Sequence, residues 1–144
     1  MANFEATRVI RFGDCDPAGI AYFPRYFDLL NGVVEDWWSA IGLPWKVLLG
    51  ERRIGLPTVR FKVEFHAPAR LGDELRFSLD IKRIGKKSVE LHHVIRRDAI
   101  LLWQASQILV ATSLDSHRSI TWPDDIRAAL ISFQERTHAH NSAA

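Results

Sequence analysis

One long segment in the first half of the chain has hydrophobic residues at helical spacing. Between residues 23 and 41 the apolar side chains follow steps of three and four: Phe23, Phe27, Leu30, Val33, Val34, Trp37 and Ile41. This spacing predicts an amphipathic helix with one apolar face. Gly42 and Pro44 follow, as is typical of a helix end. Residues 44–55 are less regular, and we expect at most a short helical piece there.

Beyond residue 57 the hydrophobic period changes to two. In segment 58–67, Val59, Phe61, Val63 and Phe65 alternate with charged or polar residues, and the same alternation marks the segments 75–84, 88–96 and 101–112. Short turns separate these segments, so they predict antiparallel strands. Residues 7–12 form a further predicted strand before the long helix. Pro123 and two acidic residues then begin a predicted helix at 126–136, followed by a tail, 137–144, that we expect to be disordered.

The predicted architecture is α+β, with a strand, a long helix and four antiparallel strands in one domain, residues 1–136. A single amphipathic helix has to bury its apolar face, and the sheet offers the largest apolar surface. We therefore expect a curved antiparallel sheet wrapped around one central helix. A layered unit of this size leaves one sheet edge uncovered, which predicts dimerisation through that edge.

Composition narrows the class of protein. The 144 residues are 47% hydrophobic and 25% charged, a globular balance, and the net charge of +2 is too small to predict a nucleic-acid partner. Cys15 is the only cysteine, so no internal disulfide forms and a reducing compartment is favoured. No signal peptide and no apolar run of about 18 residues is present. We expect a cytoplasmic protein without a membrane partner.

The chemistry is predicted in the segment 13–19, Gly-Asp-Cys-Asp-Pro-Ala-Gly, immediately before the long helix. A helix N-terminus offers unpaired backbone N–H groups and a partial positive charge, which polarise a carbonyl and stabilise an oxyanion. A carboxylate on the same loop can attack the carbonyl carbon or activate a water beside it. Gly13 and Gly19 allow the backbone to approach a ligand closely.

Plainer explanations compete for the same residues. Both aspartates can organise a turn; we favour that interpretation for Asp14, and catalysis for Asp16 because of the surrounding motif. A metal site at this pair is disfavoured, since no further carboxylate or histidine has ligand spacing. Cys15 is disfavoured as a nucleophile because no histidine lies nearby in sequence. We expect it to be a small buried side chain.

Several histidines and tryptophans have a structural interpretation beside a functional one. His66 ends a predicted strand, and a solvated strand-end position is favoured over a place in the site. His92 and His93 are consecutive in a strand, so they face opposite sides and cannot form a ligand pair. Trp37 and Trp38 cannot both face the sheet, so we expect one in the core or acyl pocket and the other at an interface.

The segment Gly13-Asp14-Cys15-Asp16-Pro17-Ala18-Gly19-Ile20 resembles the signature of the 4-hydroxybenzoyl-CoA thioesterase family, whose members have the hot-dog fold. Four weaker motifs follow in the order of that family: Gly42-Leu43-Pro44, Gly55-Leu56-Pro57-Thr58-Val59, Lys86-Lys87-Ser88 and Ile120-Thr121-Trp122-Pro123. The resemblance covers most of the chain. It implies a curved antiparallel sheet around a central helix, and a homotetramer built as a dimer of dimers with sites at subunit interfaces.

The resemblance also implies roles. Asp16 matches the catalytic carboxylate, as nucleophile or general base, and the backbone N–H of Phe23 matches the oxyanion donor. The implied substrate-binding residues are Gly19, Tyr22, Tyr26, Asn31, Thr58 and Val59. The implied CoA-binding residues, partly from another subunit, are Lys86, Lys87, Ser88 and Arg118. A solvated hairpin explains Lys86 and Lys87 equally well.

The resulting hypothesis is an acyl-CoA thioesterase that releases free acid and CoA from an aromatic acyl-CoA of benzoyl or hydroxybenzoyl type, with no metal and no cofactor. One departure bears on the substrate. Asn31 stands where the 4-hydroxybenzoyl enzyme has an acid, and an amide cannot bring a negative charge to a phenol; other aromatic or aliphatic acyl groups stay open. The alternative is a hot-dog module that binds acyl-CoA or acyl carrier protein without hydrolysis. A dehydratase is disfavoured because residues 1–65 contain no histidine.

Overall fold

A computed structural model describes the backbone of residues 3–143 and the side chains of residues 3–137. The helices are α1 (Phe23–Ala40) and α2 (Asp124–Ala143), with a 3-10 turn, η1 (Phe12–Asp14), and a short π-helical piece, η2 (Lys46–Glu51). The strands are β1 (Phe4–Val9), β2 (Ile54–Gly55), β3 (Thr58–Phe65), β4 (Glu74–Ile84), β5 (Ser88–Arg97), β6 (Ile100–Val110) and β7 (Thr112–Ser113).

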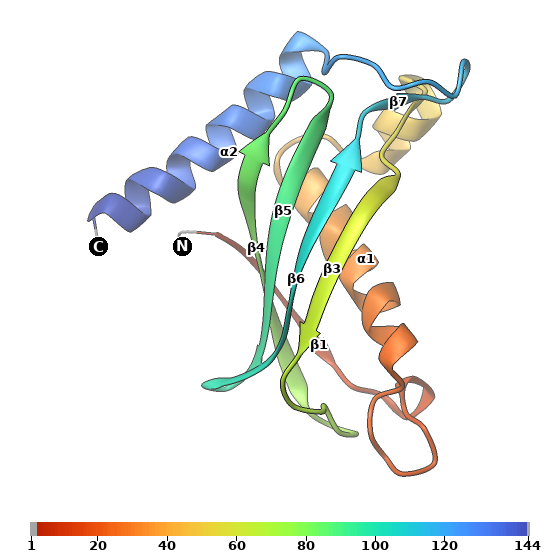
Figure 1. Ribbon diagram of the computed structural model, residues 1–144, viewed down its shortest axis with the longest axis vertical. Coiled ribbons are helices and arrows are strands. Elements are labelled where there is room, and N and C mark those ends of the chain that lie inside the picture. Colours follow the sequence, from red (N-terminus) through yellow and green to blue (C-terminus); the bar gives the residue numbers. More distant parts are fainter. Residues whose placement is uncertain (1–2, 144) are drawn as a thin grey trace.

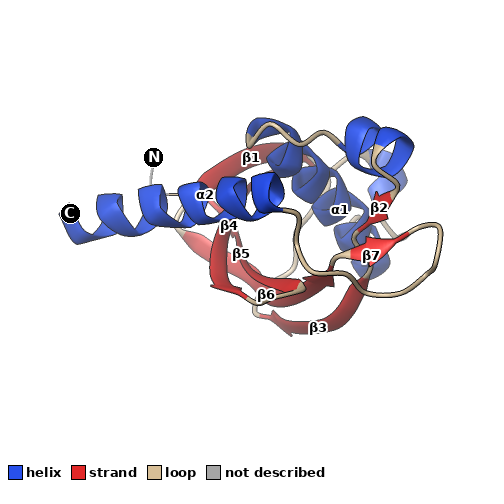
Figure 2. Cartoon of the chain, turned by 90° about the horizontal axis from the view of Figure 1, so that it is seen from above, coloured by secondary structure: helices blue, strands red, loops and turns tan. Residues whose placement is uncertain are grey.

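The five long strands form one antiparallel sheet in the order β1-β4-β5-β6-β3, and β2 pairs with β7. The sheet curves around α1, which lies against its concave face (Figures 1 and 2). The predicted α+β architecture and its central helix are therefore confirmed. None of the described helices is long and apolar enough to span a membrane.

Several boundaries differ from the sequence prediction. β1 covers Phe4–Val9 instead of 7–12, because its pairing with β4 runs from Phe4 to Val9, and η1 then begins at Phe12. The short strands β2 and β7 carry no alternating pattern and were missed. α2 continues to Ala143, past the predicted end at residue 136, so the backbone of the expected disordered tail is helical as far as it is described. Thr137, the first residue of that tail, is buried, and its hydroxyl donates to the Phe133 carbonyl.

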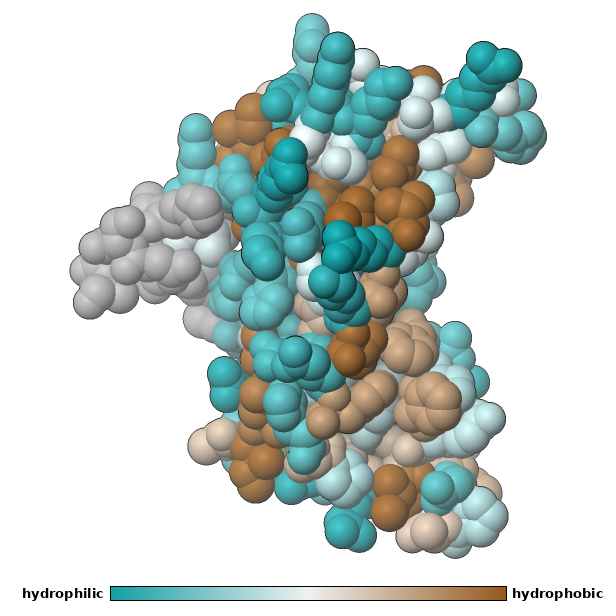
Figure 3. Space-filling model, in the orientation of Figure 1, coloured by the Kyte–Doolittle hydropathy of each residue, from teal (hydrophilic) through white to brown (hydrophobic). Residues whose placement is uncertain are grey.

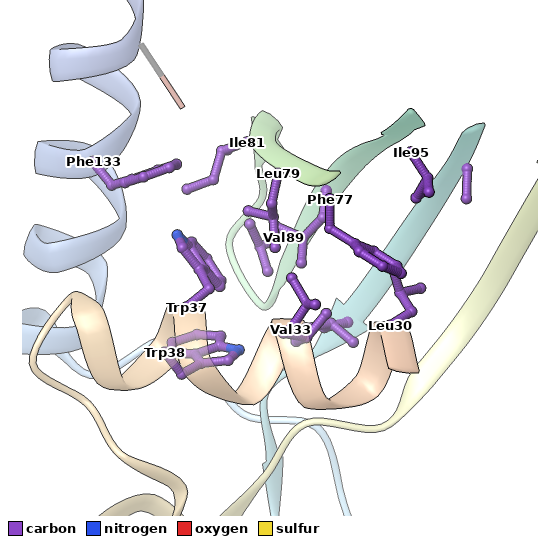
Figure 4. Close-up of a cluster of buried hydrophobic side chains, with 14 of the residues drawn as sticks. Leu30, Val33, Trp37, Trp38, Phe77, Leu79, Ile81, Val89, Ile95 and Phe133 are labelled. Atoms are coloured by element: carbon purple, nitrogen blue, oxygen red, sulfur yellow. The ribbon is translucent and has the colours of Figure 1, made fainter. Parts of the chain in front are cut away.

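The core lies between α1 and the concave face of the sheet. The buried side of α1 consists of Tyr26, Leu30, Val33, Val34, Trp37 and Trp38. Both tryptophans are fully buried, so the expectation that one of them lies at an interface is not met within this chain. Their neighbours differ. Trp37 packs edge-on against Phe133 of α2, with 5.4 Å between the ring centroids (Figure 4). The ring centroid of Trp38 lies 6.1 Å from that of Trp122.

A buried polar pair interrupts this apolar core. His93 lies on the inner face of β5, fully buried, and its Nε2 is 2.9 Å from the side-chain oxygen of Gln107 on β6. Burial lowers the pKa of His93 to about 4, although the hydrogen bond with Gln107 opposes the shift. His93 is therefore a neutral imidazole near pH 7. His92 is only half-buried and contributes to the outer face of the sheet, as the alternation predicts.

The Trp37–Phe133 contact fastens α2 to the body of the protein. We predict that Phe133→Ala lowers the free energy of unfolding by about 3 kcal/mol, the usual cost of removing a buried aromatic ring. Urea unfolding followed by tryptophan fluorescence measures the change. Glu135→Ala, at an exposed position of the same helix, is the control and should change stability little. Equal effects of the two substitutions would show that the contact does not hold α2.

The buried imidazole makes stability depend on pH. In the unfolded chain His93 protonates near its ordinary pKa of 6.5, but in the folded protein only near 4, so the unfolded state binds more protons between these values. We predict that stability falls by up to about 3 kcal/mol as the pH drops from 6.5 to 4. Chemical unfolding at several pH values should show this slope in the wild type and in His92→Leu, and a smaller slope in His93→Leu. An unchanged slope in His93→Leu would contradict the assignment.

Candidate functional site

The loop before α1 is held in place by Asp14. One carboxylate oxygen accepts a hydrogen bond from the backbone N–H of Arg11 at 2.9 Å, and the other lies 3.4 Å from the guanidinium of Arg25. The Asp14 carbonyl accepts from the N–H of Tyr22 at 2.7 Å. The side chain is buried. Asp14 therefore organises the loop, which confirms the structural interpretation of this residue.

Asp16 closes a tight turn on the same loop. Its Oδ1 accepts hydrogen bonds from the N–H groups of Ala18, at 2.9 Å, and Ile20, at 3.4 Å. The backbone returns on itself through Gly19, whose φ of +76° lies in the region that favours glycine. Within the described part of the chain, no donor bonds to Oδ2. One oxygen thus fixes the orientation of the carboxylate, and the other stays available on a half-buried side chain.

α1 begins directly after this loop. Tyr22 caps the helix in an extended conformation, Phe23 is its first residue, and Pro24 suits the first turn because it needs no hydrogen-bond donor. The N–H of Phe23 has no partner within the helix. None of the described residues in the first turn of α1 is acidic, so no side chain there neutralises the positive end of the helix dipole. The helix start can therefore accept a developing negative charge.

Cys15 lies between the two aspartates but is poorly suited to attack. Burial and the neighbouring charges of Asp14 and Asp16 raise the pKa of its thiol. The Sγ atom lies 3.4 Å from the carbonyl oxygen of Arg11. A raised pKa disfavours the thiolate, which is the reactive form. This agrees with the sequence interpretation that Cys15 is not a nucleophile.

A small cavity of about 310 Å³ lies at the start of α1, lined by Ile20, Ala21, Phe23, Tyr26, Phe65, His66, Ala67 and Pro68. The hydroxyl of Tyr26 accepts a hydrogen bond from the Ala69 N–H at 3.1 Å, which fixes the position of the ring beside this cavity. Burial raises the pKa of this phenol. Tyr22 is exposed beside it. His66 is exposed as expected, and it nevertheless borders the cavity.

A larger cavity, of about 550 Å³, lies between α1 and the edge strand β3. Its walls are Phe27, Asp28, Leu30, Asn31, Thr58, Phe61, Val63 and Gln107. Asn31 and Thr58, which the resemblance assigned to the substrate, therefore line one cavity. Val59 is 60% exposed on the edge strand. Hydrophobic side chains are visible beside β3 and the first turns of α1 in Figure 3.

Gln107 was not predicted as a site residue. It is buried on the inner face of β6, where its Nε2 donates to the Thr58 hydroxyl at 2.9 Å and its Oε1 meets His93. The sequence signal was weak but present, because a glutamine occurs at an inward position of a strand that is otherwise apolar on that face. A buried amide of this kind needs partners, and their identity depends on strand pairing.

The predicted CoA-binding residues gather at the opposite end of the sheet from Asp16. The carbonyls of Lys86 and Ser88 accept hydrogen bonds from the backbone and indole N–H of Trp122, and Arg118 lies in the turn after β7. Lys86, Lys87 and Ser88 come just after the end of β4, whereas the Asp16 loop lies beside the first residues of β4 (Figure 1). Eleven residues of strand span roughly 35 Å. A single chain therefore does not bring the two groups of residues together.

The chain is similar to known proteins in sequence and in structure. Residues 10–130 match the family model of the thioesterase-like superfamily. A 4-hydroxybenzoyl-CoA thioesterase of Pseudomonas sp. strain CBS-3 is 35% identical over 116 residues, covering 76% of this chain and 82% of the relative.

Two solved structures of thioesterases have the same fold as this chain. The structure of 4-hydroxybenzoyl CoA thioesterase from the same strain superposes with a TM-score of 0.82 and 31% identity, covering 88% of this chain and 98% of that one. The structure of a 1,4-dihydroxy-2-naphthoyl-CoA thioesterase from Synechocystis superposes with a TM-score of 0.82 and 25% sequence identity, covering 90% of this chain and 96% of that one. The sequence match, the loop before α1 and the curved sheet around that helix lead to one conclusion: the chain is a hot-dog protein of the thioesterase-like superfamily.

Proposed function

We propose that the protein hydrolyses an aromatic acyl-CoA to the free acid and CoA, with Asp16 as the catalytic carboxylate. The observation that carries this proposal is the arrangement at the start of α1. A carboxylate with one unoccupied oxygen lies on the loop that leads into a helix whose first N–H, at Phe23, has no intrahelical partner. A nucleophile or base next to an oxyanion donor is the minimum that acyl transfer requires.

The proposed reaction starts with the thioester carbonyl at the Phe23 N–H. As the carbonyl carbon is attacked, negative charge develops on its oxygen, and the N–H and the helix dipole stabilise it. In one route Asp16 attacks the carbon, the C–S bond breaks, CoA leaves as the thiolate, and water then hydrolyses the mixed anhydride. In the other route Asp16 takes a proton from water while the water oxygen attacks the carbon; the C–S bond of the tetrahedral intermediate then breaks, and CoA leaves as the thiolate. Both routes give the same products and need no metal or redox cofactor.

The acyl group is proposed to lie along α1, in the cavities beside it. Phe23 and Phe27 lie one helical turn apart, with ring centroids separated by 6.5 Å, and Phe61 faces Phe27 at 5.4 Å. Such rings suit the face of an aromatic acyl group. The relatives named for 4-hydroxybenzoyl-CoA and 1,4-dihydroxy-2-naphthoyl-CoA act on aromatic thioesters, which supports the same class here. Gly19, Tyr22 and Val59 are proposed to contact the same acyl group; the ring of Tyr22 lies 6.0 Å from that of Phe23.

The CoA part is proposed to contact a second copy of the chain. Lys86, Lys87, Ser88 and Arg118 place cationic and hydroxyl groups, suited to phosphates, far from the Asp16 of their own chain. The edge strand β3 is open for pairing, with exposed apolar side chains at Val59 and Phe65. A dimer of dimers would supply both ends of each site. Because the chain has one cysteine and can form no internal disulfide, we propose a cytoplasmic setting.

We predict that Asp16→Asn lowers kcat by about 10²- to 10⁴-fold, because the amide cannot act as nucleophile or base. Asparagine keeps the oxygen that holds the turn, so KM and the unfolding midpoint should change little. Thiol release is measured with benzoyl-, 4-hydroxybenzoyl-, 1,4-dihydroxy-2-naphthoyl-, phenylacetyl- and aliphatic CoA. Asp98→Asn, at an exposed turn with φ of +53° that asparagine also adopts, is the matched control.

Two outcomes would overturn this account. A folded Asp16→Asn variant that retains the wild-type rate would rule out the proposed catalytic role. A wild type that releases no thiol from any CoA or acyl-carrier-protein ester would favour the non-catalytic binding module instead.

A further inference from the structure

The larger cavity is mostly apolar but carries uncharged polar groups, one on α1 and two on the sheet. Asn31, Thr58 and Gln107 line it together with aromatic and aliphatic side chains. The one charged group, Asp28, is exposed and paired with Arg25 at 3.2 Å. Burying an amide costs free energy unless it is hydrogen-bonded. Asn31 and Thr58 are exposed, whereas Gln107 is buried, so the hydrogen bonds of Gln107 are the feature to explain.

A chain of hydrogen bonds connects the two polar groups on the sheet to the core. His93 Nε2 is 2.9 Å from Gln107 Oε1, and Gln107 Nε2 donates to Thr58 Oγ1 at 2.9 Å. In this arrangement the His93 N–H donates to the amide oxygen of Gln107, and the amide N–H of Gln107 donates to the Thr58 oxygen. The hydroxyl proton of Thr58 is then free to donate to a ligand. If the amide is turned over, with the other tautomer of His93, Thr58 donates to Gln107 and its oxygen is left to accept.

Either polarity leaves hydrogen-bonding capacity at the cavity end of the chain. With the amide oxygen toward His93, Gln107 Nε2 has two hydrogens, and among the described residues only Thr58 accepts one of them. Thr58 itself is exposed at the edge strand, so its hydroxyl is accessible. The neutral His93 satisfies the core end of the chain. Requirements of the core therefore explain the His93–Gln107 pair, but they leave one Nε2 hydrogen of the buried Gln107 without an acceptor among the described residues.

We infer that Gln107, oriented by His93, and Thr58 form a neutral specificity wall that selects acyl groups carrying an uncharged hydroxyl on the ring. This inference rests on the proposed thioesterase function. Gln107 and Thr58 contact the acyl group, whereas His93 is a positioning residue that acts through Gln107. Because the wall carries no charge, it recognises the phenol in its neutral form. A site whose polar groups hydrogen-bond to a substrate hydroxyl discriminates against the analogue without that hydroxyl, because the polar groups are then left unpaired.

The test compares ring-matched substrates with and without the hydroxyl: 4-hydroxybenzoyl-CoA against benzoyl-CoA, and 1-hydroxy-2-naphthoyl-CoA against 2-naphthoyl-CoA. The wild type is expected to prefer the hydroxylated member of whichever pair it hydrolyses faster. Gln107→Met, which keeps the length but removes both hydrogen-bonding ends, should lower the ratio of kcat/KM values about tenfold, mainly through KM. Gln104→Met, on the opposite face of β6, should keep the wild-type ratio.

Because Gln107 is buried and its substitution can disturb folding, a second pair of variants changes an exposed residue instead. Thr58→Val removes the hydroxyl at an exposed edge position, and Thr58→Ser retains it. The valine variant should lose the preference and the serine variant should keep it. An unchanged ratio in folded Gln107→Met and in Thr58→Val would overturn the inference while leaving the proposed function intact. If the wild type hydrolyses no aromatic acyl-CoA, the proposed function fails first, and this inference fails with it.

Discussion

The burial of one face of α1 against the concave sheet is the constraint on which the rest of the structure depends. Leu30, Val33 and Trp37 are almost fully buried there, so the helix can neither slide nor rotate without opening the core. Its N-terminus is consequently fixed near the beginning of β4. The preceding loop is tied to the same place, because the carbonyl of Gly19 accepts from Leu71 and the N–H of Ile10 donates to Asp73. The candidate site is thus built on rigid elements.

Two aspartates on one short loop carry different tasks because their surroundings differ. Asp14 is buried and uses both oxygens and its carbonyl to hold the loop against Arg11, Arg25 and Tyr22. Asp16 is half-buried and uses one oxygen for the turn. The structural residue keeps the loop in shape, so that the proposed catalytic residue is presented beside the helix start.

Elements with a strong local pattern could be predicted from sequence, and those set by long-range pairing could not. The three- and four-residue spacing from Phe23 to Ile41 predicted α1 almost to the residue. The chain from His93 to Thr58 was missed because it joins three strands, and it depends on the registers that pair His93 with Ala105 and Phe61 with Gln107. The loop motif identified the family, but the separation of Lys86 from Asp16 became visible only in the folded chain.

The burial of both Trp37 and Trp38 has a similar reason. Consecutive helix residues point about 100° apart, and the sequence alone showed a single packing partner, the sheet. In the structure α2 supplies Phe133 as a neighbour of Trp37, and the segment before α2 supplies Trp122 for Trp38. A helix with two packing surfaces can bury a wider face than a helix on a sheet alone.

The most direct test of the central claim is a crystal structure of Asp16→Asn bound to an unhydrolysed hydroxyaryl-CoA. The account predicts that the thioester oxygen lies about 2.7–3.1 Å from the Phe23 backbone nitrogen, with the substituted amide side chain at position 16 beside the carbonyl carbon. The phosphates should meet Lys86, Lys87 and Arg118 of a second copy of the chain. A thioester bound away from the start of α1, with the Phe23 N–H facing solvent, would contradict the account.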